Sequence, residues 1–127
     1  MRTSPFPFIK PALATIKKNN DVRRVLAANG DNGTTERLVQ HFLDPEFFPV
    51  RKRDQICHRL KELGFTIVAA NGDHGLIAEE HREVASPDFD SVTEALERMM
   101  SDQGWQYDGW ECAVADRASD EGPDTAP

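Results

Sequence analysis

The sequence predicts an α+β protein, a ferredoxin-like βαββαβ sandwich with an extra amino-terminal helix. Two strand-like segments, 36–43 and 76–82, are each followed by a helical pattern that ends at a glycine. Each helix leads into another apolar or aromatic strand, beginning at Phe65 and at Trp105. Asn71-Gly72, the strongest hairpin signal in the chain, joins the two halves. In this plan both helices cover one face of the sheet and leave the other free.

The length of 127 residues suits a single small domain. We expect a loose arm at 1–20, where three prolines remove backbone donors, then the ferredoxin-like domain at 21–114. The segment 115–127 is acidic and nearly without large apolar side chains, which predicts a disordered tail. The chain shows neither a long apolar run nor a signal-peptide pattern, so we expect a cytoplasmic protein.

In the first half, a weak helical pattern starts at Ala12, restarts at Asp21 as an N-cap, and ends at the turn 30–33. The strand 36–43 has apolar residues on both faces, as a strand covered on both sides does. Asp44-Pro45 is expected to cap the next helix. That helix carries an apolar stripe closed by Gly64, formed by Ile56, Leu60 and Leu63.

In the second half, Phe65 to Ala69 and Leu76 to Arg82 form the predicted hairpin strands. Ser91 and Glu94 have the spacing of a capping box at the start of the second core helix. The last strand contains both tryptophans and the only tyrosine of the chain. Gly109 within it predicts a β-bulge that places at least one ring in the core, with Asp108 and Glu111 near the surface.

Charge is divided unevenly along the chain. Residues 1–64 carry 12 basic and 7 acidic side chains, whereas residues 65–127 carry 3 basic and 15 acidic ones. An acidic second half repels phosphate and attracts basic protein surfaces. The segment 76–83 has no aromatic residue and three glutamates, so it predicts no RNA-binding platform and no direct nucleic-acid binding. The basic residues at 51–61 are interpreted as a solvated helix face.

No residue pattern points to catalysis. The four histidines, His41, His58, His74 and His81, lack the spacing of a metal site, and Cys57 and Cys112 are predicted to be reduced thiols. No serine, cysteine or threonine lies in a nucleophile motif. We therefore predict a protein that is not an enzyme and that needs neither cofactor nor metal.

Four short motifs between Val22 and Val114 carry a resemblance: Gly30-Asp31, Gln40-His41-Phe42-Leu43, Leu63-Gly64-Phe65 and, the most distinctive, Tyr107-Asp108-Gly109-Trp110. With this order of elements, the chain resembles the regulator of ribonuclease activity B family, bacterial protein inhibitors of ribonuclease E. The resemblance implies a ferredoxin-like cytoplasmic protein without cofactor or catalysis that binds the ribonuclease and alters RNA turnover. The chain departs from the family in its basic first core helix and its short acidic tail.

Two functions stay open at this point. The first is an inhibitory module whose partner is a ribonuclease with a basic, RNA-handling segment. Its expected contact residues are Asp108, Glu111, Glu79, Glu80, Tyr107 and Trp110. The second is a small-molecule-sensing or oligomerising module that uses the free sheet face against a ligand or a second copy. An acidic, open face favours the first function, and an apolar, paired face favours the second.

Overall fold

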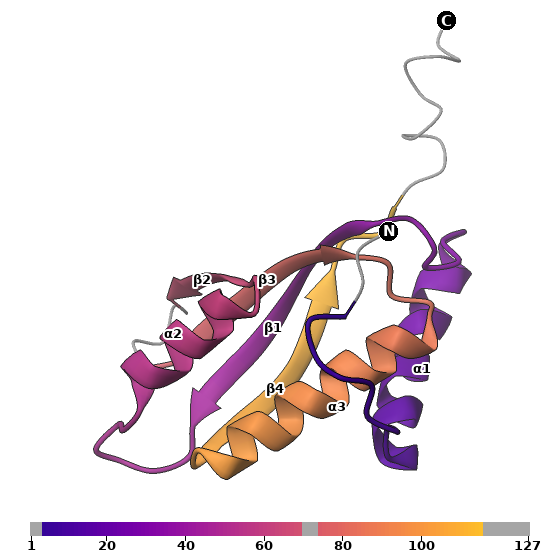
Figure 1. Cartoon of the computed structure of the whole chain (residues 1–127). Helices are drawn as coiled ribbons and strands as arrows, with labels where there is room; N and C mark the ends of the chain where they lie inside the picture. Colours follow the sequence, from indigo (N-terminus) through magenta and orange to yellow (C-terminus); the bar gives the residue numbers. More distant parts are fainter. Residues whose placement is uncertain (1–3, 70–73, 116–127) are drawn as a thin grey trace, which may run out of the picture.

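The computed structural model describes residues 4–69 and 74–115. Its helices and strands follow one another in a single α+β domain (Figure 1). In chain order these are α1 (Leu13–Ala28), β1 (Arg37–Pro45), α2 (Arg53–Glu62), β2 (Thr66–Ala69), β3 (Leu76–Arg82), α3 (Pro87–Asp102) and β4 (Trp105–Cys112).

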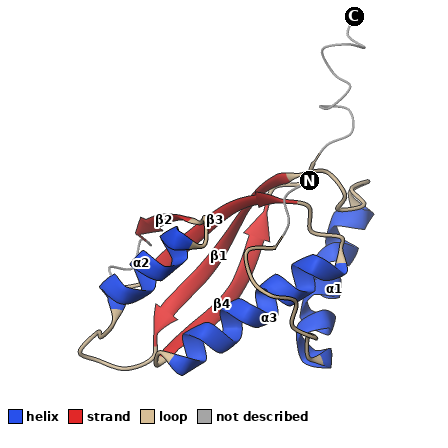
Figure 2. Cartoon of the chain, in the orientation of Figure 1, coloured by secondary structure: helices blue, strands red, loops and turns tan. Residues whose placement is uncertain are grey.

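The four strands form one antiparallel sheet in the order β2-β3-β1-β4 (Figure 2). Each β-α-β unit is split by an antiparallel strand: β3 lies between β1 and β2, and β1 lies between β3 and β4. The predicted ferredoxin-like plan is confirmed, and so is the pairing of the two hairpin strands. The turn predicted at Asn71-Gly72 lies outside the described residues, as does the tail 116–127.

The helices cover one face of the sheet and bury its inward-facing side chains. Leu43 of β1, Leu60 of α2, Leu96 of α3 and Trp105 of β4 belong to the larger core cluster, and each is at most 2% exposed. A smaller cluster contains Leu26, which brings α1 against the same layer beside α3. All three helices therefore lie on this side of the sheet.

Two helices begin later or earlier than the sequence predicts. Asp44 and Pro45 pair with Gln106 and Trp105 of β4, so they end β1 and do not cap a helix. Strand pairing takes these residues, and α2 starts only after Lys52, whose φ is 64°. The capping box predicted at Ser91 and Glu94 is also wrong. α3 begins at Pro87 with Ser86 as N-cap, and this places both residues inside the helix.

The amino-terminal segment is attached to α3 instead of being a loose arm. The Ile9 and Ala12 amides donate hydrogen bonds to the Ser91 hydroxyl (2.8 Å) and the Glu94 carboxylate (2.9 Å). α1 begins at Leu13 and continues through Asp21, so the predicted restart there does not occur. These contacts across the fold stabilise a segment whose prolines alone predict irregular chain. Residues 4–20 are thus part of the folded unit.

Candidate functional site

Two of the sequence motifs lie side by side on β1 and β4. His41 pairs with Trp110 and Leu43 pairs with Tyr107, with a register shift between the two pairs. Gly109, with a φ of 99°, lies at this irregularity, which confirms the predicted bulge. Because of the extra residue, both aromatic rings of the motif face the helices. Asp108 and Glu111 are exposed on the opposite side.

A buried polar network surrounds His41, which is 0% exposed. Its Nδ1 lies 2.8 Å from the Tyr107 hydroxyl and its Nε2 lies 2.8 Å from Glu80 Oε2. Glu80 also accepts a hydrogen bond from Nε of the buried Arg82 at 2.9 Å. A neutral imidazole protonated on Nε2 satisfies both neighbours, with the tyrosine hydroxyl donating and the carboxylate accepting.

The ionisation of this network fits a structural role. Burial raises the pKa of Glu80, but the hydrogen bonds and charge interactions with His41 and Arg82 lower it by more. The pKa of Glu80 is therefore below its usual value. The pKa of Tyr107 is well above its usual value because of burial and the charge of Glu80. Glu80 is therefore a carboxylate and Tyr107 a neutral phenol at neutral pH. They hold β1, β3 and β4 together inside the fold.

Trp110 connects the β4 motif to α1. Its Nε1 donates to Asn19 Oδ1 at 2.8 Å, and Asn19 Nδ2 donates to Asp90 (2.8 Å) and Thr93 (2.9 Å) of α3. The indole also packs edge-on against Phe89, with ring centroids 4.6 Å apart. The tryptophan is thus a structural link between a strand and two helices.

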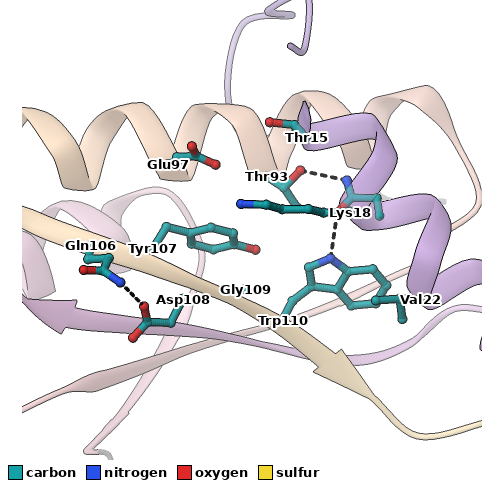
Figure 3. Close-up of a pocket in the computed structure, with 11 residues that line it drawn as sticks. Thr15, Lys18, Val22, Thr93, Glu97, Gln106, Tyr107, Asp108, Gly109 and Trp110 are labelled. Carbon is teal, nitrogen blue, oxygen red and sulfur yellow. Dashed lines mark hydrogen bonds between the residues drawn. The ribbon is translucent and has the colours of Figure 1, made fainter. Parts of the chain in front are cut away.

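A cleft of about 440 Å³ lies between α1, α3 and β4. Its lining residues are shown in Figure 3: Thr15, Lys18, Asn19, Val22, Thr93, Glu97, Gln106, Tyr107, Asp108, Gly109 and Trp110. Several of its polar groups bond to one another. Asn19 binds Trp110 and Thr93, and Gln106 Nε2 donates to Asp108 Oδ1 at 2.7 Å. These bonds leave few of those polar groups to select a small ligand.

Within residues 4–69 and 74–115, no helix packs on the sheet face opposite α1, α2 and α3. We call it the open face and define it by strand alternation and cross-strand pairing. It comprises Thr66 and Val68 of β2, Ile77, Glu79 and His81 of β3, Leu38, Gln40, Phe42 and Asp44 of β1, and Gln106, Asp108 and Glu111 of β4.

Charge is sharply divided between the two sides of the molecule. The open face has four carboxylates (Asp44, Glu79, Asp108 and Glu111) and neither lysine nor arginine. The exposed cations of the described residues lie on the helices, the amino-terminal segment and the loop before α2: Lys10, Lys17, Lys18, Arg24, Arg51, Lys52, Arg59, Lys61 and Arg98. The strand arginines Arg37 and Arg82 are buried and bind Asp31 and Glu80. Apart from His81, every ionisable side chain of the open face is therefore acidic.

Asp44 and Asp108 interact at one corner of the open face. The hydrogen bond to Asp108 raises the pKa of Asp44 to about 6, with further contributions from burial and from the Asp108 charge. Asp44 of β1 is paired with Gln106 of β4, and Asp108 lies two residues after Gln106 on the same strand. This corner of the open face thus places two acidic side chains next to each other, which concentrates negative potential there.

The structure brings together three of the six residues predicted to contact a partner. Asp108, Glu111 and Glu79 lie on the open face, but Glu80 is 3% exposed and belongs to the buried network. The prediction that Glu80 contributes to an acidic surface is wrong, because its side chain faces the helices.

The aromatic residues of the β4 motif also lie away from the open face. Tyr107 and Trp110 are partly buried on the helix-covered side. Sequence reasoning missed Asp44, which it assigned to a helix cap. Its alternation with Leu38, Gln40 and Phe42 was the available signal.

Within residues 4–69 and 74–115, no group of three or more His, Cys, Asp or Glu side chains is placed to hold a metal ion. No helix in this part of the chain is long and apolar enough to cross a membrane. Cys57 and Cys112 are free, partly buried thiols.

In a comparison with protein families, the model of the regulator of ribonuclease activity B matches residues 16–112. The chain belongs to the regulator of ribonuclease activity B family. The match confirms the resemblance carried by the short motifs and implies regulation of ribonuclease activity. In this member of the family, the matched region runs from within α1 to the end of β4, so it includes the buried network and the whole open face. A search of curated protein sequences found no match.

Proposed function

We propose that this chain binds an endoribonuclease of the ribonuclease E type in the bacterial cytoplasm and inhibits it without catalysing a reaction itself. The observation that supports this proposal most directly is the family match over residues 16–112. The charge of the open face supports the proposal, because an RNA-handling enzyme has basic surfaces that an anionic face attracts. Asp108, Glu111 and Glu79 are the sequence-predicted contact residues that lie on this face.

The test measures cleavage of a fluorescent RNA by purified ribonuclease E while the concentration of this protein is raised. We expect the rate to fall to a plateau and the two proteins to form a complex in sedimentation experiments. The same RNA without the enzyme should not bind the protein, because the anionic face repels phosphate. An unchanged cleavage rate together with the absence of a complex at micromolar concentration overturns the proposal.

One observation favours a second candidate, an oligomerising module. Leu38 and Val68 on the open face are 40% and 41% exposed, so the face offers apolar contact area. Four carboxylates on the same face repel an identical copy, which favours a basic partner over self-association. Sedimentation of the protein alone decides this. A stable dimer that the variant Leu38→Ser dissociates supports the second candidate.

A further inference from the structure

The open face combines its charges with an apolar row. Val68 of β2, Ile77 of β3 and Phe42 of β1 are direct cross-strand neighbours, and they form a line across three strands. Leu38 lies four residues before Phe42 on the same face of β1, with Gln40 between them, and is 40% exposed. Such side chains on an otherwise uncovered sheet face are available to pack against another molecule.

Carboxylates lie on both sides of this apolar row. On one side, Glu79, Gln40 and Glu111 are direct cross-strand neighbours in a second row. Gln40 Nε2 donates to Glu79 Oε2 at 2.8 Å. On the other side are Asp44 and the Asp108 that it hydrogen-bonds. The apolar row thus lies between acidic side chains, and Leu38 adds apolar surface beyond the row of Glu79, Gln40 and Glu111. Apolar surface flanked by polar groups is the arrangement of a protein interface.

We infer that the open face is the docking surface for an amphipathic basic segment of the partner protein, with apolar side chains over the row Val68, Ile77 and Phe42 and arginines or lysines over the flanking carboxylates. The inference rests on the proposed function for the identity of the partner, but the chemistry of the face alone specifies the kind of segment. Charge complementarity supplies the argument, because the face carries four carboxylates and neither Lys nor Arg.

The same composition argues against other occupants. Single-stranded RNA needs cations for its phosphates and exposed aromatic rings for stacking, whereas the open face offers carboxylates and one partly buried phenylalanine. A second copy of this chain would bring carboxylate against carboxylate, which opposes a two-fold symmetric contact. A purely polar basic segment would leave the apolar row in contact with water.

The first experiment measures binding of purified ribonuclease E to open-face variants and to matched controls on other surfaces. Leu38→Ser and Val68→Ser are compared with Leu13→Ser and Val25→Ser, whose side chains are 84% and 61% exposed on α1. Asp108→Lys is compared with Asp102→Lys, an exposed position in the last turn of α3. Thermal melts of all six variants verify that each one folds.

We expect each open-face variant to weaken ribonuclease binding at least about tenfold and each control to change it less than about twofold. Asp108→Lys should also reduce the dependence of binding on salt concentration, since fewer opposite charges are screened. If the folded open-face variants bind as the wild type does, the inference is overturned while the proposed function stands. Equal losses in variants and controls also contradict it.

A second experiment does not depend on the ribonuclease. NMR spectra of the labelled protein are recorded with a 12-residue synthetic peptide that alternates arginine and leucine. Peptides that alternate arginine with serine and glutamate with leucine serve as controls. The arginine–leucine peptide should shift amides of all four strands and bind at least about fivefold more tightly than either control. Shifts confined to α1 and α3, or equal binding of all three peptides, overturn the inference even if ribonuclease E does not bind at all.

Discussion

Replacing Glu80 by glutamine should be among the most damaging single changes to this fold. The Glu80 side chain is 0% exposed and accepts hydrogen bonds from His41 Nε2 (2.8 Å) and Arg82 Nε (2.9 Å). Glutamine has nearly the same shape, but it turns one acceptor oxygen into a donor and removes the negative charge beside a buried arginine. Breaking a buried ion pair in this way costs about 3–5 kcal/mol, a large share of the ~5–15 kcal/mol that stabilises a typical domain.

The neighbouring residue provides the matched control. Glu79 lies on the open face, is partly exposed, and accepts one hydrogen bond from Gln40, so Glu79→Gln should cost less than about 1 kcal/mol. Urea unfolding followed by tryptophan fluorescence gives both free energies of unfolding. A loss below about 1 kcal/mol for Glu80→Gln, or equal losses for the two variants, would refute the reasoning.

The pH dependence of the same pair of proteins gives an independent check. The pKa of Glu80 lies below its usual value in the folded state, so its ionised form stabilises the fold above the unfolded-state pKa of about 4.5. That contribution is lost as the pH falls from there through the folded-state pKa. The stability difference between wild type and Glu80→Gln should therefore be full at pH 7 and shrink below about pH 4.5.

Three further changes test other parts of the structure. Trp105→Ala should cost about 3–5 kcal/mol in urea unfolding, because the 2% exposed ring also donates a hydrogen bond to the Arg51 carbonyl; a loss under 1 kcal/mol argues against a core role. Asp108→Asn should return the pKa of Asp44 from about 6 toward its usual value, as read by carboxyl NMR. Because a raised carboxyl pKa makes the folded wild type more stable as pH falls through 6, the variant should lack that rise in stability. An unchanged pKa of Asp44 in the variant contradicts the interaction with Asp108. Gly109→Ala should cost about 1–2 kcal/mol by the same unfolding assay, since φ is 99° and no atom lies within 4 Å of the added Cβ, so only the backbone is strained; an unchanged stability argues against that conformation.

The elements that follow from local pattern were predictable. The strand 76–82 was predicted with the bounds that the structure has, because its apolar residues are bounded by turn signals. Gly104 ended the second core helix at the expected place, and Gly109 gave the bulge. These features depend on the backbone freedom of glycine and on the period of a strand, both of which are readable from a few residues.

Features that depend on distant contacts were missed. The prolines of the amino-terminal segment predict irregular chain, but nothing local shows that Ser91 and Glu94 bind its backbone. The burial of Glu80 was partly readable, since Leu76 and Ala78 share its face and Arg82 follows two residues later. Its histidine partner comes from β1, 39 positions away, and only the sheet order brings them together.

The position of β4 at the edge of the sheet has a consequence for solubility. The outer backbone of an edge strand is a template for pairing with strands of other molecules, and proteins suppress this with charges and bulges on the edge. β4 has both, with Asp108 and Glu111 on its exposed side and the irregularity at Gly109. The carboxylates of the proposed docking surface thus also oppose aggregation of the free protein. Reversal of their charge preserves that protection, whereas replacement by apolar residues removes it.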